Sequence, residues 1–158
     1  MAYPKTYRAV RRTAPPYPLQ VEITTETLPD ALAPNDVLVR IHAVSLNYRD
    51  VAMLREGKYP IPVEERGIEG SDCAAEVVAV GALVRKFSLG DHVAPTINSA
   101  LLTGDERDAV PKALGGDIPG TIREYAVYHE EHLVRLPEHL SWEEVRFVGV
   151  GVCPGSPS

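Results

Sequence analysis

Residues 44–81 read VSLNYRDVAMLREGKYPIPVEERGIEGSDCAAEVVAVG. A loop leads to Asn47, and an acidic residue three positions later is typical of a helix that begins there. The chain then turns at Lys58-Tyr59-Pro60 and passes Gly70-Ser71-Asp72 into the apolar run Ala74–Val80. The stretch therefore predicts a loop, one short helix, a turn and a buried β-strand.

The segments on either side of this stretch mostly predict strands. Residues 37–43 alternate, so that Arg40 and His42 share one face, and His42 is interpreted as a solvent-side strand residue and not as a ligand. The other face carries Val37, Val39 and Ile41. Glu124–Val127 predicts another short strand. Fourteen prolines and 12 glycines interrupt these runs at short intervals, which favours a small antiparallel barrel over a doubly wound sheet.

Two helix starts can be read from the sequence. After Asn47, the side chains of Val51, Leu54 and Ala52 are expected to face inward. Ser141-Trp142-Glu143-Glu144 matches the capping-box pattern S-x-x-E, so a second helix should begin near Trp142. The nearby Gly149, Gly151 and Pro154 should keep it short.

The composition is that of one folded domain. The chain has 158 residues, 44% of them hydrophobic, and a net charge of −6, which disfavours nucleic acid and anionic membrane as partners. No apolar stretch approaches the roughly 20 residues of a membrane span, and the first residues lack the apolar core of a secretory signal. The two cysteines, Cys73 and Cys153, cannot build a disulfide framework, so a cytoplasmic location is expected. Cys73 is interpreted as a small, half-buried hydrophobic residue beside a strand.

The order of features in residues 44–81 resembles the N-terminal, GroES-like catalytic domain of the medium-chain dehydrogenase/reductase superfamily. That superfamily includes zinc alcohol dehydrogenases and zinc-free quinone and enoyl reductases. The resemblance covers roughly Tyr7 to Val145. Its further segments are Leu32–Ala43, the F-x-x-G-D-x-V pattern at Phe87–Val93, Gly120–Val127, and the two runs 133–137 and 140–144.

The resemblance implies a mainly β fold with short helices, a GroES-like, partly open antiparallel β-barrel without a Rossmann domain. It places this domain at residues 1–145 and leaves 146–158 as a divergent tail, such as a frameshift or an altered splice supplies. The chain is then expected to be truncated before the cofactor domain. Gly149-Val150-Gly151 suggests a phosphate loop, but the seven residues after it cannot form the required βαβ unit.

The resemblance is to the zinc-free branch. Where zinc enzymes carry a cysteine and a His-Glu pair, this chain has Asn47 and Ser71-Asp72, and one carboxylate does not hold zinc. No cysteine lies between Cys73 and Cys153, so the four-cysteine structural zinc site is absent. The segment Thr96–Gly120 is interpreted as a mobile surface loop.

The resemblance implies NADP(H)-dependent reduction of small carbonyl, quinone or enone substrates without a metal. Asn47, Tyr48 and Tyr59 are the candidate catalytic residues, and Asn47 and Arg49 the candidate cofactor-binding residues. Each has a structural alternative: a helix cap for Asn47, core packing for Tyr48 and loop packing for Tyr59. Structural roles are also expected for three carboxylates, namely Asp50 at the helix dipole, Asp72 in local pairing and Asp91 in a turn.

A non-enzymatic reading stays open beside the enzymatic one. In that reading the barrel is a partner-binding module or a truncated gene product, and a co-chaperonin-like ring subunit is a weaker third alternative. As an isolated chain it is expected to be inactive, and to self-associate through an uncovered strand edge.

Overall fold

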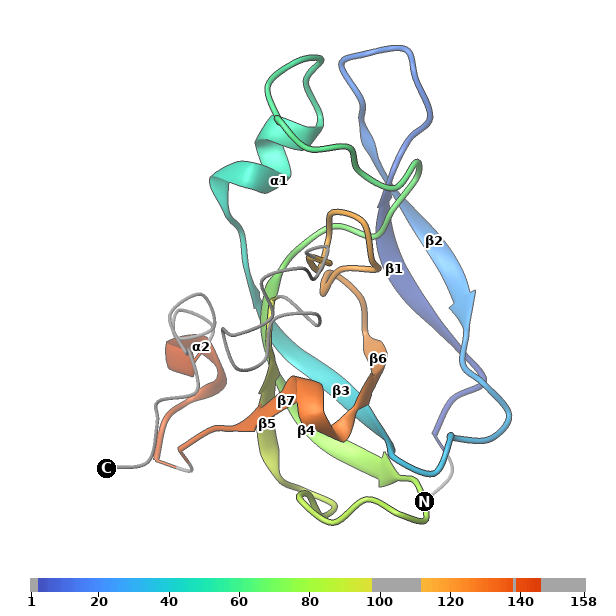
Figure 1. Ribbon diagram of the computed structural model, residues 1–158, viewed down its shortest axis with the longest axis vertical. Helices are drawn as coiled ribbons and strands as arrows, with labels where there is room; N and C mark the ends of the chain where they lie inside the picture. Colours follow the sequence, from blue (N-terminus) through green and yellow to red (C-terminus); the bar gives the residue numbers. More distant parts are fainter. Residues whose placement is uncertain (1–2, 98–111, 138, 146–158) are drawn as a thin grey trace.

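The computed structural model describes residues 3–97, 112–137 and 139–145. Within these ranges the secondary structure is mainly β (Figure 1). Its elements are β1 Thr6–Arg12, β2 Val21–Thr27, β3 Asp36–Ser45, α1 Tyr48–Met53, β4 Asp72–Val80, β5 His92–Pro95, β6 Tyr125–His129, a 3-10 helix Glu130–His132, β7 Leu133–Arg135 and α2 Trp142–Val145. Neither of the described α-helices has the length and apolar character needed to cross a membrane.

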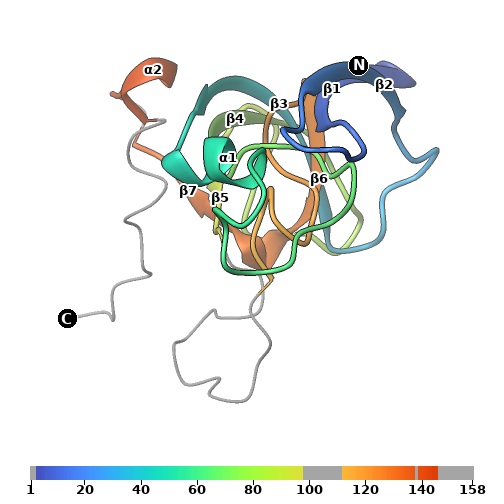
Figure 2. The same cartoon turned by 90° about the horizontal axis from the view of Figure 1, so that it is seen from above.

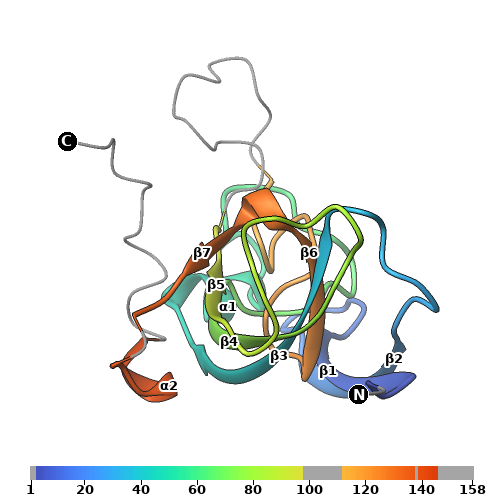
Figure 3. The same ribbon diagram turned by 90° about the horizontal axis from the view of Figure 1, so that it is seen from below.

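The strands form a curled five-stranded sheet and a separate two-stranded ribbon, β1 and β2, that packs against it. Five antiparallel strands lie in the order β6-β3-β4-β5-β7, and β1 pairs with β2 in a second sheet. Figures 2 and 3, seen along the barrel, show the five-stranded sheet bending around a common interior. Isolated bridges, Ala9 to Arg123 and Arg11 to Ile68, join the ribbon to the rest. The predicted fold class, a mainly β, partly open antiparallel barrel, is confirmed.

Strand β3 shows how the sequence pattern produces the barrel wall. Val37 and Val39 are fully buried in the main core, and Ile41 packs against it, as predicted. Arg40 and His42 are exposed on the opposite face. Leu38 lies on that opposite face but is also fully buried, in a second cluster with Tyr7, Ala9, Leu28 and Ile68. The ribbon therefore covers part of the face that alternation alone assigns to solvent.

Helix α1 lies where it was predicted, but its inward face differs. Asn47 is the N-cap, and the buried residues are Asp50, Ala52 and Met53. Val51 was expected to face inward and is 51% exposed, so that prediction is wrong. The reason is that the helix has only six residues, and the sulfur of Met53, 3.7 Å from the Arg12 guanidinium, lies on its buried side.

Two segments expected near the surface are buried. Cys73 was interpreted as half-buried but is 1% exposed, because β4 lies in the middle of the sheet, and burial raises the pKa of its thiol to about 12. The surface-loop prediction for Thr96–Gly120 is wrong at its C-terminal end, where Leu114 joins the main core and Gly115 and Gly116 are buried. The middle of that segment, 98–111, lies outside the described residues.

The second capping box is confirmed at α2. The Ser141 backbone N–H donates to Glu144 Oε2 at 2.9 Å, and the Glu144 N–H donates to Ser141 Oγ at 3.3 Å. The Trp142 ring stacks on His42, with ring centroids 4.2 Å apart, and so holds the helix against the barrel. Residues 146–158 lie outside the described residues, so the domain boundary and the divergent tail stay predictions.

The ribbon leaves an apolar edge. Among the described strands β2 pairs with β1 alone, and its Val21 and Ile23 are 53% and 73% exposed. An unpaired, apolar strand edge is a template for pairing with another chain. This edge is where the predicted self-association would begin.

Glu26 on β2 predicts a specific pH dependence of stability. Its carboxylate accepts hydrogen bonds from Arg11 Nε at 2.7 Å and Nη2 at 2.8 Å, and this pairing lowers its pKa from 4.5 to about 2. Because the folded-state pKa is depressed, the stabilisation is present above the unfolded pKa and is lost as the pH falls towards about 2.

We expect Glu26→Gln to lower the free energy of unfolding at pH 7 by about 1–3 kcal/mol, and this deficit to vanish near pH 2. Urea denaturation followed by circular dichroism at several pH values measures it. Glu22→Gln, in the more exposed pair with Arg66, is the control and should cost less. A deficit that is the same at pH 7 and pH 2 would refute the assigned pairing.

Candidate functional site

The three positions that the resemblance matches to the cysteine and the His-Glu pair of zinc enzymes come together around Asn47. As the N-cap of α1, Asn47 receives its local support from Asp50, whose Oδ2 accepts the Asn47 backbone N–H at 2.8 Å. This frees the side-chain amide, which donates to Asp72 Oδ2 at 2.5 Å and to Ser71 Oγ at 3.2 Å. Ser71 and Asp72 stand at the start of β4, so the helix cap and the central strand meet at one point.

Asp72 is held by local contacts, as predicted, yet it is not fully satisfied. It is 1% exposed, and its Oδ2 also accepts from Ser71 Oγ at 3.1 Å. Its Oδ1 is buried and has no hydrogen-bond partner among the described residues. Burial raises the pKa of this carboxyl, against the opposing effect of the hydrogen bonds from Asn47 and Ser71. Asn47, Ser71 and Asp72 thus form a polar cluster, and its carboxylate is buried next to the apolar residues of β4.

Arg49 and Tyr59, two other predicted site residues, are in direct contact. Arg49 Nη2 donates to the Tyr59 hydroxyl oxygen at 3.1 Å, and the guanidinium carbon lies 5.6 Å from the centre of the tyrosine ring. Arg49 is itself fixed by Nη1, which donates to the Leu114 carbonyl at 2.8 Å. Tyr59 is half-buried. Its hydroxyl therefore accepts one hydrogen bond from a positioned cation while its own proton stays available for donation.

Tyr48 lies apart from these contacts. It is 80% exposed, so the alternative that places its ring in the core is wrong. It borders a hollow of about 330 Å³ together with Val51, Arg55 and Lys58. Its catalytic role stays a prediction.

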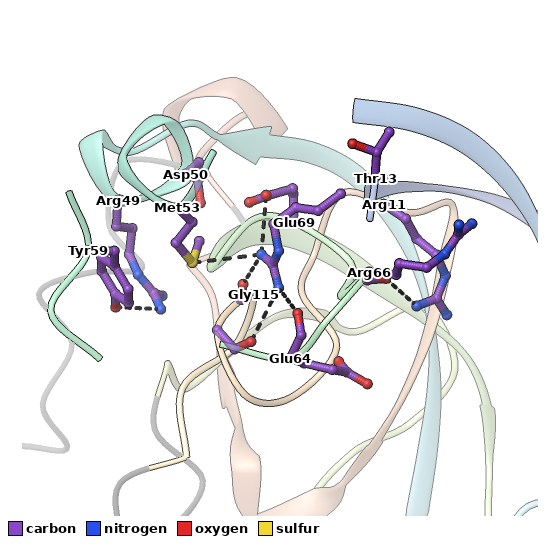
Figure 4. A network of polar contacts seen from close by, with 12 residues as sticks. Arg11, Thr13, Arg49, Asp50, Met53, Tyr59, Glu64, Arg66, Glu69 and Gly115 are labelled. Carbon is purple, nitrogen blue, oxygen red and sulfur yellow. Dashed lines mark hydrogen bonds and ion pairs between the residues drawn. The ribbon is translucent and has the colours of Figure 1, made fainter. Parts of the chain in front are cut away.

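A buried ion pair next to the site was missed by the sequence analysis. Arg12, with 0% exposure, and Glu69, with 2%, lie 3.2 Å apart at Nη1 and Oε1. Arg12 also donates to the carbonyls of Gly115 at 2.7 Å and Glu64 at 2.9 Å (Figure 4). Burial raises the pKa of Glu69, and Arg12 opposes that effect.

This ion pair ties three distant segments together beneath the helix. Figure 4 shows Met53 of α1, Glu69 and Gly115 converging on the same point. No local sequence pattern indicates such an ion pair. Arg12 and Glu69 are far apart in the chain, and in the sequence each resembles an ordinary surface charge.

Comparison with known proteins identifies the domain. The model of the alcohol dehydrogenase GroES-like domain matches residues 33–138. The chain belongs to this family. Its curled sheet, with a short helix after β3 and the Gly70-Ser71-Asp72 corner before β4, is the GroES-like fold predicted from residues 44–81.

The relatives of this GroES-like domain are oxidoreductases of the medium-chain dehydrogenase/reductase superfamily. A zinc-type alcohol dehydrogenase-like protein of Schizosaccharomyces pombe is 40% identical over 119 residues, which cover 75% of this chain and 34% of that protein. A quinone oxidoreductase of Pseudomonas aeruginosa is 36% identical over 115 residues, 73% of this chain and 29% of that protein. The chain therefore spans about a third of the length of these relatives.

A solved structure supports the same assignment. The 2-octenoyl-CoA carboxylase reductase from Streptomyces superposes with a TM-score of 0.76 at 26% identity. The match covers 94% of this chain and 42% of that chain.

Proposed function

We propose that this GroES-like domain serves a zinc-independent, NADP(H)-dependent oxidoreductase that reduces small carbonyl, quinone or enone substrates. The observation that carries the proposal is the hydrogen bond from Arg49 to the Tyr59 hydroxyl, next to a buried cluster of Asn47, Ser71 and Asp72. The names of the quinone oxidoreductase and the reductase among its relatives fit this substrate class.

The donor set at the Asn47 cluster does not fit zinc. Zinc in catalytic sites takes three ligands from cysteine, histidine and carboxylate. Here one carboxylate, Asp72, is offered, and its Oδ2 is already the acceptor for Asn47 and Ser71. Among the described residues no group of three or more potential ligands of the His, Cys, Asp or Glu type gathers. Substrate activation is therefore assigned to hydrogen-bond donors.

Tyr59 is the donor we assign to the substrate. A nicotinamide cofactor, when bound, supplies the hydride to the activated double bond. The phenol of Tyr59 then gives its proton to the oxygen or carbon that gains charge, and the Arg49 guanidinium stabilises the phenolate left behind. Arg49 acts at this point as a positioning residue for Tyr59.

Asn47 suits a contact to a hydroxyl better than one to a substrate carbonyl. Its two amide hydrogens have acceptors already, Asp72 and Ser71, and its side-chain oxygen faces the Asp50 backbone N–H in the capping box, so one lone pair of Oδ1 remains. An acceptor at this place can receive a hydroxyl of the cofactor ribose or of the substrate. We therefore keep Asn47, with Arg49, as the proposed cofactor-facing residues.

A chimera tests the proposed function. Residues 1–145 would replace the corresponding domain of the Pseudomonas aeruginosa quinone oxidoreductase, and NADPH oxidation would be followed with a quinone and an enone. We expect the chimera to reduce at least one of them, and the 158-residue chain alone to show neither turnover nor micromolar NADPH affinity. Positioning the hydride donor about 3–3.5 Å from the substrate needs a nucleotide-binding domain.

Two results would count against the proposal. One is a folded chimera that binds NADPH but reduces no carbonyl, quinone or enone, while the parent enzyme remains active. That outcome would favour a partner-binding barrel. The other is tight NADPH binding by the 158-residue chain itself, measured by titration calorimetry.

A further inference from the structure

A second cavity lies beside β6, lined by side chains that take no part in the proposed transfer of hydride and proton. It has a volume of about 340 Å³ and is bordered by β6, the 3-10 helix and the turn around Leu114. Its polar lining comes from Thr96, Arg123, Tyr128, His129 and His132, and no carboxylate of the described residues lines it. The rest of its lining is aliphatic or proline. This volume is in the range that holds a small organic molecule.

Arg123 brings a positive charge to this cavity without a counter-charge. No aspartate or glutamate among the described residues forms an ion pair with it, and its Nε is buried without a hydrogen-bond partner. The positive charge of Arg123 interacts electrostatically with the Glu26 carboxylate and helps to lower its pKa. That carboxylate, however, already forms an ion pair with Arg11 at 2.7 Å. Arg123 is half-buried, and cations withdrawn from water are normally paired with an anion, so a guanidinium without a carboxylate partner at a cavity wall points to a missing anion.

Tyr128 supplies a second unsatisfied donor at the same wall. Its ring centre lies 5.7 Å from the Arg123 guanidinium carbon, its side chain is 8% exposed, and its buried hydroxyl has no hydrogen-bond partner among the described residues. Burial raises the pKa of this phenol to about 12, so the hydroxyl keeps its proton and can donate. The Arg123 guanidinium is stabilised electrostatically by the Tyr128 and Tyr7 hydroxyls, while Arg123 Nε and the Tyr128 hydroxyl proton lack an acceptor among the described residues.

His129 and His132 also line the cavity. Burial, and after it the neighbouring His129, lower the pKa of His132, so its ring is largely neutral at pH 7. His129 Nδ1 lies 3.9 Å from a carboxylate oxygen of Glu131. Arg123 is thus the one permanent cation among the lining residues, in a chain of net charge −6. One fixed positive charge beside aliphatic walls matches a monoanion with an apolar body.

We propose that this cavity binds a small organic monocarboxylate. Its carboxylate lies between the Arg123 guanidinium and the Tyr128 hydroxyl, and its apolar body packs against Leu114, Ile118 and Val127. The site contains neither Tyr59 nor Asn47, although Leu114, whose carbonyl accepts from Arg49, lines it. Its occupation does not depend on the proposed hydride chemistry.

Hexanoate binding to the 158-residue chain tests the proposal. Saturation-transfer NMR and titration calorimetry should show saturable binding. Arg123→Gln should abolish it, and Tyr128→Phe, which removes the hydroxyl alone, should weaken it about 5- to 10-fold. Arg66→Gln, an exposed arginine on the far ribbon side, should leave it unchanged. Because Arg123 has no internal counter-charge, Arg123→Gln should melt no earlier than the parent chain.

The proposal fails if the parent chain shows no saturable hexanoate binding. It also fails if Tyr128→Phe binds hexanoate as tightly as the parent, a result that is informative even if Arg123→Gln does not fold. Tighter binding of inorganic phosphate than of hexanoate would contradict the monocarboxylate assignment. An inactive chimera with intact hexanoate binding would refute the proposed function alone.

Discussion

Replacing Arg12 by methionine is expected to lower the free energy of unfolding by about 3–5 kcal/mol, because Glu69 then stays buried without its counter-charge. The carbonyls of Gly115 and Glu64 also lose their donor. A domain of this size has a total free energy of unfolding of about 5–15 kcal/mol, so this single change should remove a large fraction of the stability. Urea denaturation followed by circular dichroism measures the loss.

Two further variants separate the ion pair from the packing. Glu69→Gln leaves Arg12 with its carbonyl acceptors and should cost less than Arg12→Met. Arg66→Met removes an exposed arginine from its pair with Glu22 and should change the unfolding midpoint little. If Arg12→Met behaved like Arg66→Met, the buried pair would have no structural role.

The second large effect is expected at Tyr59. In the chimera described above, Tyr59→Phe should reduce kcat about 10²- to 10⁴-fold, the usual contribution of a general acid, while KM changes little. The phenyl ring keeps the packing and its stacking beneath Arg49 and removes only the proton donor. Steady-state NADPH oxidation provides both constants.

Arg49→Gln distinguishes the positioning role from simple packing. It removes the hydrogen bond that Arg49 Nη2 donates to the Tyr59 hydroxyl, so kcat should fall while the KM for the quinone changes little. Tyr48→Phe is the matched control, because that exposed tyrosine has no contact of this kind among the described residues and its catalytic role is the least supported. Equal losses in Tyr48→Phe and Tyr59→Phe would contradict the assignment of the proton donor.

The strands and helix starts could be predicted because local chemistry controls them. The alternation of Val37 and Val39 with Arg40 fixes the inner face of β3, and the acidic residue after Asn47 fixes the start of α1. The family pattern also predicts that Asn47, Ser71 and Asp72 lie close together, and the hydrogen bonds among their side chains agree with it.

The missed features depend on contacts between distant segments. Val51 is exposed since Met53, beside Arg12, takes the inward position on a helix too short to bury both faces. Leu38 is buried because the β1-β2 ribbon packs over it. The sequence of β3 alone does not indicate that this contact exists. The setting of Arg123 has the same origin, because the tyrosines that face it, Tyr7 and Tyr128, come from β1 and β6.

Zinc content tests the central claim, a metal-free site, most directly. The purified chain would be dialysed against a mild chelator and its metal measured by mass spectrometry, beside the triple variant Asn47→Cys, Ser71→His, Asp72→Glu. That variant introduces the cysteine and the His-Glu pair that the resemblance places at these positions, so it shows whether the chain can retain zinc when the ligands fit. We predict stoichiometric zinc in the variant and only traces in the parent chain. Stoichiometric zinc in the parent chain would contradict the account.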